Sequence, residues 1–138
     1  MPSRFRNSLH QGLCAELAFL LKATQLGARV ARPLDHNARY DFIVEHNNRL
    51  HRVQVKSVNS ERHRAYPINT STVSFPRYSP GEIDFLAAYI IPLDTWYIIP
   101  ARAIARTGMI YLRPHRNSRA RRFEKYREAW HQLIADVQ

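Results

Sequence analysis

The chain has 138 residues, 45% of them hydrophobic, and 21 Lys and Arg stand against 11 Asp and Glu, which gives a net charge of +10. This length fits one domain with a single core over residues 1–138. No apolar run approaches the roughly 18 residues of a membrane span, and the N-terminus lacks the apolar stretch of a secretory signal. We therefore expect a cytoplasmic protein. The one cysteine leaves no internal disulfide framework, and the excess of Arg favours a polyanionic partner such as nucleic acid.

The first predicted element is a helix at about 7–26, which Asn7 or Ser8 can cap and which Gly27 stops. Leucines recur in it at spacings of three and four and predict its buried face. They are Leu9, Leu13, Leu17, Leu20 and Leu21. Glu16 falls within or beside this stripe, where a carboxylate costs stability unless a cation, a metal or a hydrogen-bond donor meets it.

The elements that follow are mostly strands, recognised by alternation and by β-branched or aromatic residues. They are predicted at about 29–32 (an edge strand), 40–45, 50–57, 73–75, 85–91, 96–99 and 109–112. Residues 58–72 are expected to form a loop, Ser79-Pro80 to start a helix, and 101–106 to make one or two helical turns. The last element is an amphipathic helix at 118–137, with inward residues Phe123, Tyr126, Trp130, Leu133, Ile134 and Val137. This order predicts an α/β (α+β) domain.

The segment 40–57, YDFIVEHNNRLHRVQVKS, predicts a hairpin that turns at Asn47-Asn48, because Asn tolerates the positive φ of a tight turn. Symmetric pairing then places Asp41 opposite Gln54, with Lys56 next to them on the same face. The other face is apolar and consists of Phe42, Val44, Val53 and Val55. A solvated network of cross-strand pairs would also explain the polar face. The basic charge and Glu16 favour a functional site instead.

Asp41, Gln54 and Lys56 suit the hydrolysis of a phosphodiester. One or two Mg²⁺ ions can neutralise the phosphate, activate water and protect the leaving oxygen, and Mg²⁺ prefers oxygen ligands. Asp41 would be the central ligand, beside the amide oxygen of Gln54 and the carbonyl of Val55. Lys56 would orient or deprotonate the attacking water, since a nearby divalent ion lowers the pKa of a lysine, or would hold the phosphate. Mn²⁺ can substitute for Mg²⁺.

The sequence "RYDFIV" followed by "HRVQVKS" resembles the PD-(D/E)XK nuclease superfamily, and more narrowly its branch associated with group I introns, in which glutamine replaces the acidic residue before X-Lys. The resemblance covers about residues 12–112. It implies a restriction-endonuclease-like αβββαβ core with a mixed central sheet flanked by helices, a divalent metal and cleavage of DNA. The implied site residues are Asp41, Gln54 and Lys56, with Glu16 as the helix carboxylate and Gln11 as a weaker candidate.

The sequence departs from the family pattern at two positions. Tyr40 stands where the name-giving proline would be, which is common among members. Gln54 is neutral, so the site carries one fewer negative charge, and weaker metal binding is expected.

The basic residues expected to contact nucleic acid are Arg62 and Arg64, after the second hairpin strand, and Arg119, Arg121 and Arg122 in the run RPHRNSRARR. A solvated surface is the alternative for both groups. Because a domain this small must reach two DNA strands, we expect a homodimer or a higher homo-oligomer. Two other functions fit the same residues: a non-catalytic nucleic-acid-binding module, and a structure-specific nuclease like the Holliday-junction resolvases. A basic, RNA-associated structural protein fits less well.

Overall fold

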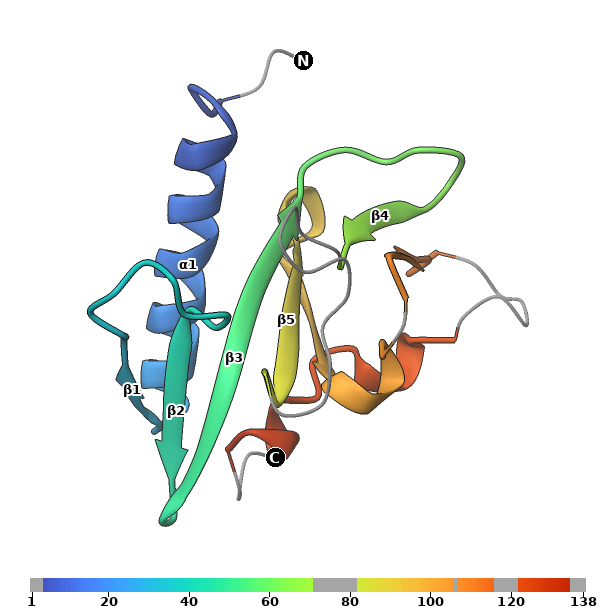
Figure 1. Cartoon of the computed structure of the whole chain (residues 1–138). Coiled ribbons are helices and arrows are strands. Elements are labelled where there is room, and N and C mark those ends of the chain that lie inside the picture. The colour runs from blue at the N-terminus through green and yellow to red at the C-terminus, as the bar shows by residue number, and fades with distance from the viewer. Residues whose placement is uncertain (1–3, 71–81, 106, 116–121, 135–138) are drawn as a thin grey trace.

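The structure, a computed structural model, describes residues 4–70, 82–105, 107–115 and 122–134, and a five-stranded mixed sheet lies at its centre (Figure 1). In spatial order, the strands are β1 (Arg29–Ala31), β2 (Phe42–His46), β3 (Arg49–Val58), β5 (Phe85–Ile90) and β6 (Thr95–Pro100). β3 and β5 run parallel, and the other neighbours are antiparallel. A second, two-stranded ladder pairs β4 (Tyr66–Asn69) with β7 (Met109–Leu112). The predicted mixed sheet is confirmed.

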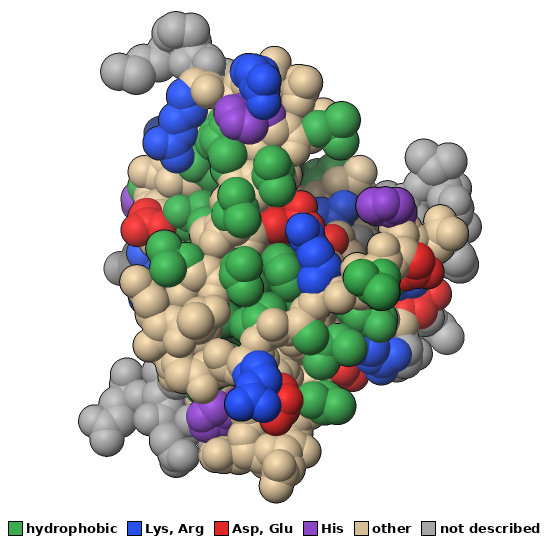
Figure 2. Space-filling view, turned by 90° about the vertical axis from the view of Figure 1, so that its left-hand side faces the viewer, with side chains coloured by type: hydrophobic (Ala, Val, Ile, Leu, Met, Phe, Trp, Pro, Cys, Tyr) green, Lys and Arg blue, Asp and Glu red, His purple; other side chains and the backbone are tan. Residues whose placement is uncertain are grey.

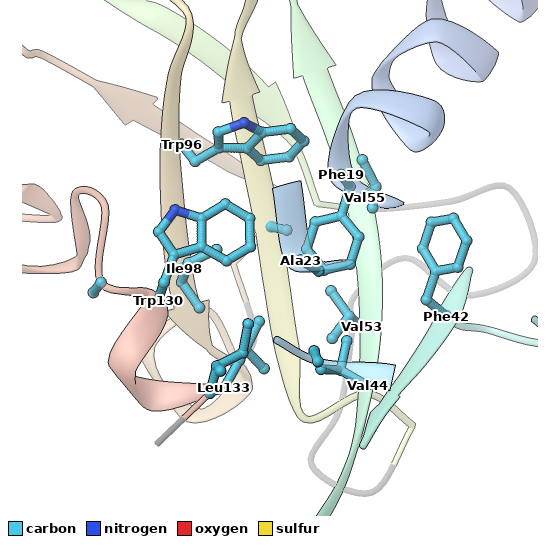
Figure 3. Packing of buried hydrophobic residues seen from close by; sticks show 14 of the residues in the cluster. Phe19, Ala23, Phe42, Val44, Val53, Val55, Trp96, Ile98, Trp130 and Leu133 are labelled. Carbon is cyan, nitrogen blue, oxygen red and sulfur yellow. The ribbon is translucent and has the colours of Figure 1, made fainter. Parts of the chain in front are cut away.

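Both faces of the sheet are covered. Helix α1 (Ser8–Gln25) covers one face together with residues 129–134 of the C-terminal segment (residues 122–134). The β4–β7 ladder covers the other face together with Phe123 and Tyr126 of that segment. Figure 3 shows the first of these cores, in which the ring of Phe19 is central. Its centroid lies 5.5 Å from that of Phe42, 5.7 Å from Trp96 and 5.6 Å from Trp130. Aromatic burial of this kind ties α1, β2, β6 and the C-terminal segment into one unit.

Helix α1 begins where the sequence predicts, because the side chain of Asn7 accepts a hydrogen bond from the amide of His10 at 2.9 Å. It ends before Gly27, whose φ of +99° lies in the left-handed region that favours glycine. Among the described residues, α1 is the one α-helix.

The buried face of α1 is not the predicted one. Ala15, Phe19 and Ala23 face the sheet and are buried. The two alanines let the helix approach the sheet closely, and Phe19 fills the space between them. Four of the five leucines of the stripe are exposed instead: Leu9, Leu13, Leu17 and Leu21. Only Leu20 packs partly against the core.

The hairpin of β2 and β3 has the predicted register, with pairs from Phe42–Val53 to His46–Arg49. Asn47 and Asn48 form its two-residue turn at φ values of 50° and 63°. The predicted core face is buried at all four positions: Phe42, Val44, Val53 and Val55. One predicted pair does not belong to the ladder. Asp41 precedes β2 by one residue, so its side chain is directed by contacts other than strand pairing.

The segment after β3 is more ordered than predicted. Residues 58–72 were expected to be a loop, but they contain β4 and a tight turn, in which Arg62 and Ala65 exchange backbone hydrogen bonds of 2.8 and 3.0 Å. The strand predicted at 73–75 and the helix start at Ser79-Pro80 lie outside the described residues. Residues 82–84, which that helix would have included, are not helical. The strands near 85–91, 96–99 and 109–112 are confirmed.

The helix predicted at 118–137 is wrong over the part that the structure describes, residues 122–134. That part forms two short 3₁₀ turns, Glu124–Tyr126 and Trp130–Gln132. Between them, the amide of Glu128 donates to the carbonyl of Trp96 at 2.7 Å, and its carboxylate accepts from the amide of Trp96 at 2.8 Å. The amide of Glu128 therefore finds its backbone partner on the edge of β6 and not within a helix. The amphipathic pattern did predict the buried side chains Phe123, Trp130, Leu133 and Ile134.

Within the described residues, no helix is both long enough and apolar enough to cross a membrane.

Candidate active site

An open strand edge lies where the two strands of the hairpin separate. β2 starts at Phe42, opposite Val53, whereas β3 continues to Val58 (Figure 1). Asp41 sits at this point: its amide donates to the carbonyl of Val53 at 2.9 Å, and its Oδ2 accepts from the amide of Val55 at 2.7 Å. The N–H and C=O of one strand residue point to the same side. The carbonyl of Val55 therefore points toward the open edge as well.

The carboxylate of Asp41 is strongly perturbed. Burial, which has the largest effect, and the nearby charge of Glu16 together raise its pKa to about 6. The hydrogen bond from Val55 and the positive charges of Lys56 and Arg32 act in the opposite direction but do not compensate. The ionised carboxylate is thus short of positive charge, which is the electrostatic condition in which a bound cation is favourable.

Glu16 reaches the same place from helix α1. Its Oε1 lies 2.7 Å from Nη2 of Arg32, just after β1, and the two form a salt bridge. Arg32 is therefore the cation that the carboxylate was expected to need. Glu16 and Asp41 line one groove of about 540 Å³, together with Arg32 and the residues that lead from β1 to β2. Glu16 borders this groove and does not lie within a buried leucine stripe.

Lys56 and Gln54 project from β3 on one face, both half-buried. Lys56 is paired with Ala88 of β5, and Gln54 with Leu86. Burial lowers the pKa of Lys56, Asp41 partly restores it, and the positive charge of Arg39 lowers it further. The structure brings Asp41 and Lys56 within electrostatic reach of each other. The hydrogen bond of Asp41 goes to the amide of Val55, so Gln54 is near by its position in the strand and not by a direct bond to Asp41.

The weaker candidate, Gln11, also points toward β3. Its Nε2 lies 3.1 Å from Oγ of Ser57, the residue after Lys56. This contact is part of the packing of α1 against β3, which places Glu16 near Asp41.

Two charged residues near Lys56 were missed by the sequence analysis. Nη2 of Arg39 lies 3.4 Å from Oε2 of Glu82, in a mostly buried salt bridge, and Arg39 acts on the pKa of Lys56. One signal was present, because Arg39 stands two residues before Asp41, where alternation repeats a face. No local pattern connects it with Glu82, which follows a segment outside the described residues.

The residues predicted to contact nucleic acid are only partly described. Arg62 and Arg64 are exposed at the turn between β3 and β4. Arg119 and Arg121 lie outside the described residues. Arg122 is exposed, and its Nη2 donates to the carbonyl of Ala103 at 3.0 Å. The described arginines thus occupy solvent-facing positions, as a phosphate contact requires.

The chemistry of the donor set fits a hard divalent cation. Among the described residues, no group of three His, Cys, Asp and Glu side chains gathers as a metal site. The candidate ligand oxygens are those of the Asp41 carboxylate, the Gln54 amide and the Val55 carbonyl. The last two groups are neutral. Oxygen donors with a single carboxylate are typical of Mg²⁺, which keeps several of its waters.

A helix on a mixed sheet, an aspartate where a hairpin opens and a Gln-X-Lys on the second strand are together typical of restriction-endonuclease-like nucleases. The family model described as PD-(D/E)XK endonuclease matches residues 7–133, and the chain belongs to this family. The solved structure of a bacterial homing endonuclease, I-Ssp6803I, is similar, with a TM-score of 0.79 and 28% sequence identity. That match covers 92% of this chain and 91% of the other. The comparison with curated proteins found no match.

Proposed function

We propose that this protein is a metal-dependent DNA endonuclease that hydrolyses phosphodiester bonds, with Asp41, Glu16, Gln54 and Lys56 as its active site and Mg²⁺ as its cofactor. The observation that carries the proposal is Asp41 itself. It is half-buried at an open strand edge, it has a pKa raised to about 6, and it lies within electrostatic reach of a lysine and a second carboxylate. Stability alone gives no reason for this arrangement.

Asp41, Gln54 and the carbonyl of Val55 would hold the cation. When bound, Mg²⁺ supplies Lewis-acid stabilisation of the phosphate and of the leaving oxygen. The hydrogen bond from Val55 fixes Oδ2 of Asp41, so the carboxylate is positioned before the substrate arrives.

Lys56 would hold the scissile phosphate or orient and deprotonate the attacking water at Nζ. Its lowered pKa favours the neutral amine that a base needs. Glu16 would order a water beside the scissile phosphate, once Arg32 turns from the carboxylate toward a phosphate. The half-exposed side chain of Arg32 allows this movement.

The direct test is cleavage of a supercoiled plasmid in Mg²⁺ by the purified protein and by the variants Asp41→Asn and Lys56→Ala. Wild type is expected to convert the plasmid, and each variant to lose at least about 100-fold of the rate. Lys125→Ala is the matched control, since it removes a lysine that lies against Tyr126, on the C-terminal segment, and it should cleave like wild type. Equal rates for all four proteins would mean a contaminating nuclease and would overturn the proposal.

DNA binding is proposed to involve Arg62 and Arg64, which the bend after β3 holds beyond the active strand. In Ca²⁺, where binding is measured without turnover, each Arg→Ala change is expected to weaken binding and to reduce the salt slope by about one. Arg49→Ala at the opposite end of β3 is the matched control. An unchanged slope in both variants would remove these two residues from the interface.

A second candidate is a DNA-binding module that keeps this fold without catalysis. It is favoured by the neutral Gln54, which leaves Asp41 as the one acidic side chain of the proposed ligand set. This candidate predicts salt-sensitive binding of DNA, no cleavage in Mg²⁺ or Mn²⁺, and no heat of metal binding by calorimetry.

A further inference from the structure

Helix α1 presents an apolar face to solvent. Leu9 is 83% exposed, Leu13 46%, Leu17 53% and Leu21 60%. They follow one another at intervals of four residues and form a single ridge along the helix. Figure 2 shows hydrophobic side chains gathered over the face of the molecule that carries α1. We refer to these four residues as the leucine ridge.

The leucine ridge has no charge within it. Between Ser8 and Gln25, the Asp, Glu, Lys and Arg residues are Glu16 and Lys22, and both are half-buried at the flanks of the helix. A surface helix normally places charged side chains opposite its buried face. The exposed face of α1 lacks them although the chain as a whole has a net charge of +10. The four leucines leave on the order of 400 Å² of apolar surface exposed in one contiguous patch, which is the size of the largest patch on a typical monomer, and such patches are often functional.

We propose that the leucine ridge is the interface at which a second copy of this chain binds, with the two α1 helices antiparallel about a two-fold axis. The ridge is self-complementary, because equal spacing matches Leu13 of one copy with Leu17 of the other, and Leu17 with Leu13. A two-fold interface needs such a match of a patch with itself. A standard interface buries about 800 Å² a side, so the leucine ridge would supply about half of that area and the polar residues around it the remainder.

Charge selects the antiparallel arrangement. A parallel pair would place Arg6 beside Arg6 and Lys22 beside Lys22, in two copies that already repel each other. The antiparallel pair places Arg6 across from Thr24 and Lys22 across from Ser8. Like charges then do not meet along the ridge, and depletion of charge at its centre is typical of the core of an interface.

A polyanion is a poor occupant for the leucine ridge, because nucleic acid is bound through cations and the ridge has none. The proposed dimer is argued from the surface of α1, and only its biological role rests on the proposed function. Two copies supply two sites for two DNA strands, and α1 carries both Glu16 and the leucine ridge, so one helix would link assembly to the active site.

The experiment is sedimentation equilibrium of the full chain without DNA, at concentrations from about 1 to 100 µM. Wild type is expected to be dimeric or a multiple of the dimer. Leu13→Glu/Leu17→Glu places four carboxylates in the interface and should weaken association at least about 100-fold. Leu50→Glu/Met109→Glu is the matched control, since it adds the same charge at exposed apolar positions away from α1, and it should assemble like wild type. Circular dichroism checks that all three proteins are folded.

A monomeric wild type, or a Leu13→Glu/Leu17→Glu variant that assembles like the control, would overturn the proposal. The direction of the helices is tested by a spin label at Ser8 in a Cys14→Ala background. The antiparallel pair predicts a separation of about 20 Å or more between labels, since fourteen helical positions of about 1.5 Å separate them. A distance below about 15 Å would refute the antiparallel arrangement.

Plasmid cleavage separates the two proposals. If the chain is a nuclease that pairs through the leucine ridge, the Leu13→Glu/Leu17→Glu variant should still nick plasmid but lose most of the linear product. A wild type that is dimeric and does not cleave would leave the interface standing and overturn the proposed function.

Discussion

Replacing Asp41 with asparagine is expected to stabilise the metal-free protein above pH 6 while it removes the proposed metal ligand. The side chain keeps nearly the same shape, and its amide oxygen can still accept the hydrogen bond from the amide of Val55, which is 2.7 Å from Oδ2 in the wild type. The substitution removes the ionisation and little else. It therefore isolates what the buried charge costs.

The size of the effect follows from the pKa of Asp41, which is about 6 in the folded protein against an ordinary value of 3.8. A raised pKa means that the folded state favours the protonated form. Stability from this group is present below pH 3.8 and is lost as the pH rises through about 6. At about 1.4 kcal/mol for each pKa unit, the full gap amounts to about 3 kcal/mol. Because Asp41 is only partly buried, we expect about 1–2 kcal/mol after screening by solvent and salt.

The assay is urea unfolding of wild type and Asp41→Asn at pH 4.5 and at pH 7.5 with a chelator present. The free energy of unfolding of the variant, relative to wild type, should rise between the two pH values. Asp35→Asn is the matched control, because it removes the same charge from an exposed side chain that lines the same groove. A difference between wild type and Asp41→Asn that is independent of pH, or that falls toward pH 7.5, would refute the reasoning.

The same proteins report on the metal. Mg²⁺ that binds the folded state alone should raise the unfolding midpoint of wild type. It should leave that of Asp41→Asn where it is.

Two further predictions concern charges that hold the structure around the site. Arg32→Gln leaves Glu16 without its salt bridge and removes a positive charge that lowers the pKa of Asp41. The free energy of unfolding should therefore depend more steeply on pH than in wild type. A shallower dependence would contradict the electrostatic account. Glu128→Ala removes the hydrogen bonds that its carboxylate accepts from the amide of Trp96 and from Nε1 of Trp130. It should lower the free energy of unfolding in urea by about 2 kcal/mol. A loss under about 0.5 kcal/mol would mean that the C-terminal segment is held by apolar burial alone.

The hairpin was predictable because its information is local. Two asparagines set the turn, and the alternation from Phe42 to Val55 sets which face is buried, so a slip of one residue would have turned the valines outward. Placing Asp41 and Lys56 near each other followed from the register. The register did not predict that the ladder ends at Phe42. Because it ends there, the carboxylate of Asp41 can accept a hydrogen bond from the amide of Val55.

The partners of the site residues were beyond sequence reasoning. The sequence indicated that the carboxylate of Glu16 requires a partner, but it did not indicate which residue provides one. Arg32 meets it because β1 pairs with β2 at the edge of the sheet and passes beside α1. Arg39 and Glu82 are separated by more than forty residues, and only the packed fold brings them together.

The sequence by itself determined where α1 starts and stops, that its leucines form one ridge, and which residues of the C-terminal segment are apolar enough to be buried. Tertiary structure decided the rest, because periodicity describes an element and not its neighbour. The sheet took the alanines and Phe19 of α1, since they allow a closer approach, and left the leucines outside. The edge of β6 bonds to both the amide and the carboxylate of Glu128, so the burial pattern remained while the predicted helix did not form.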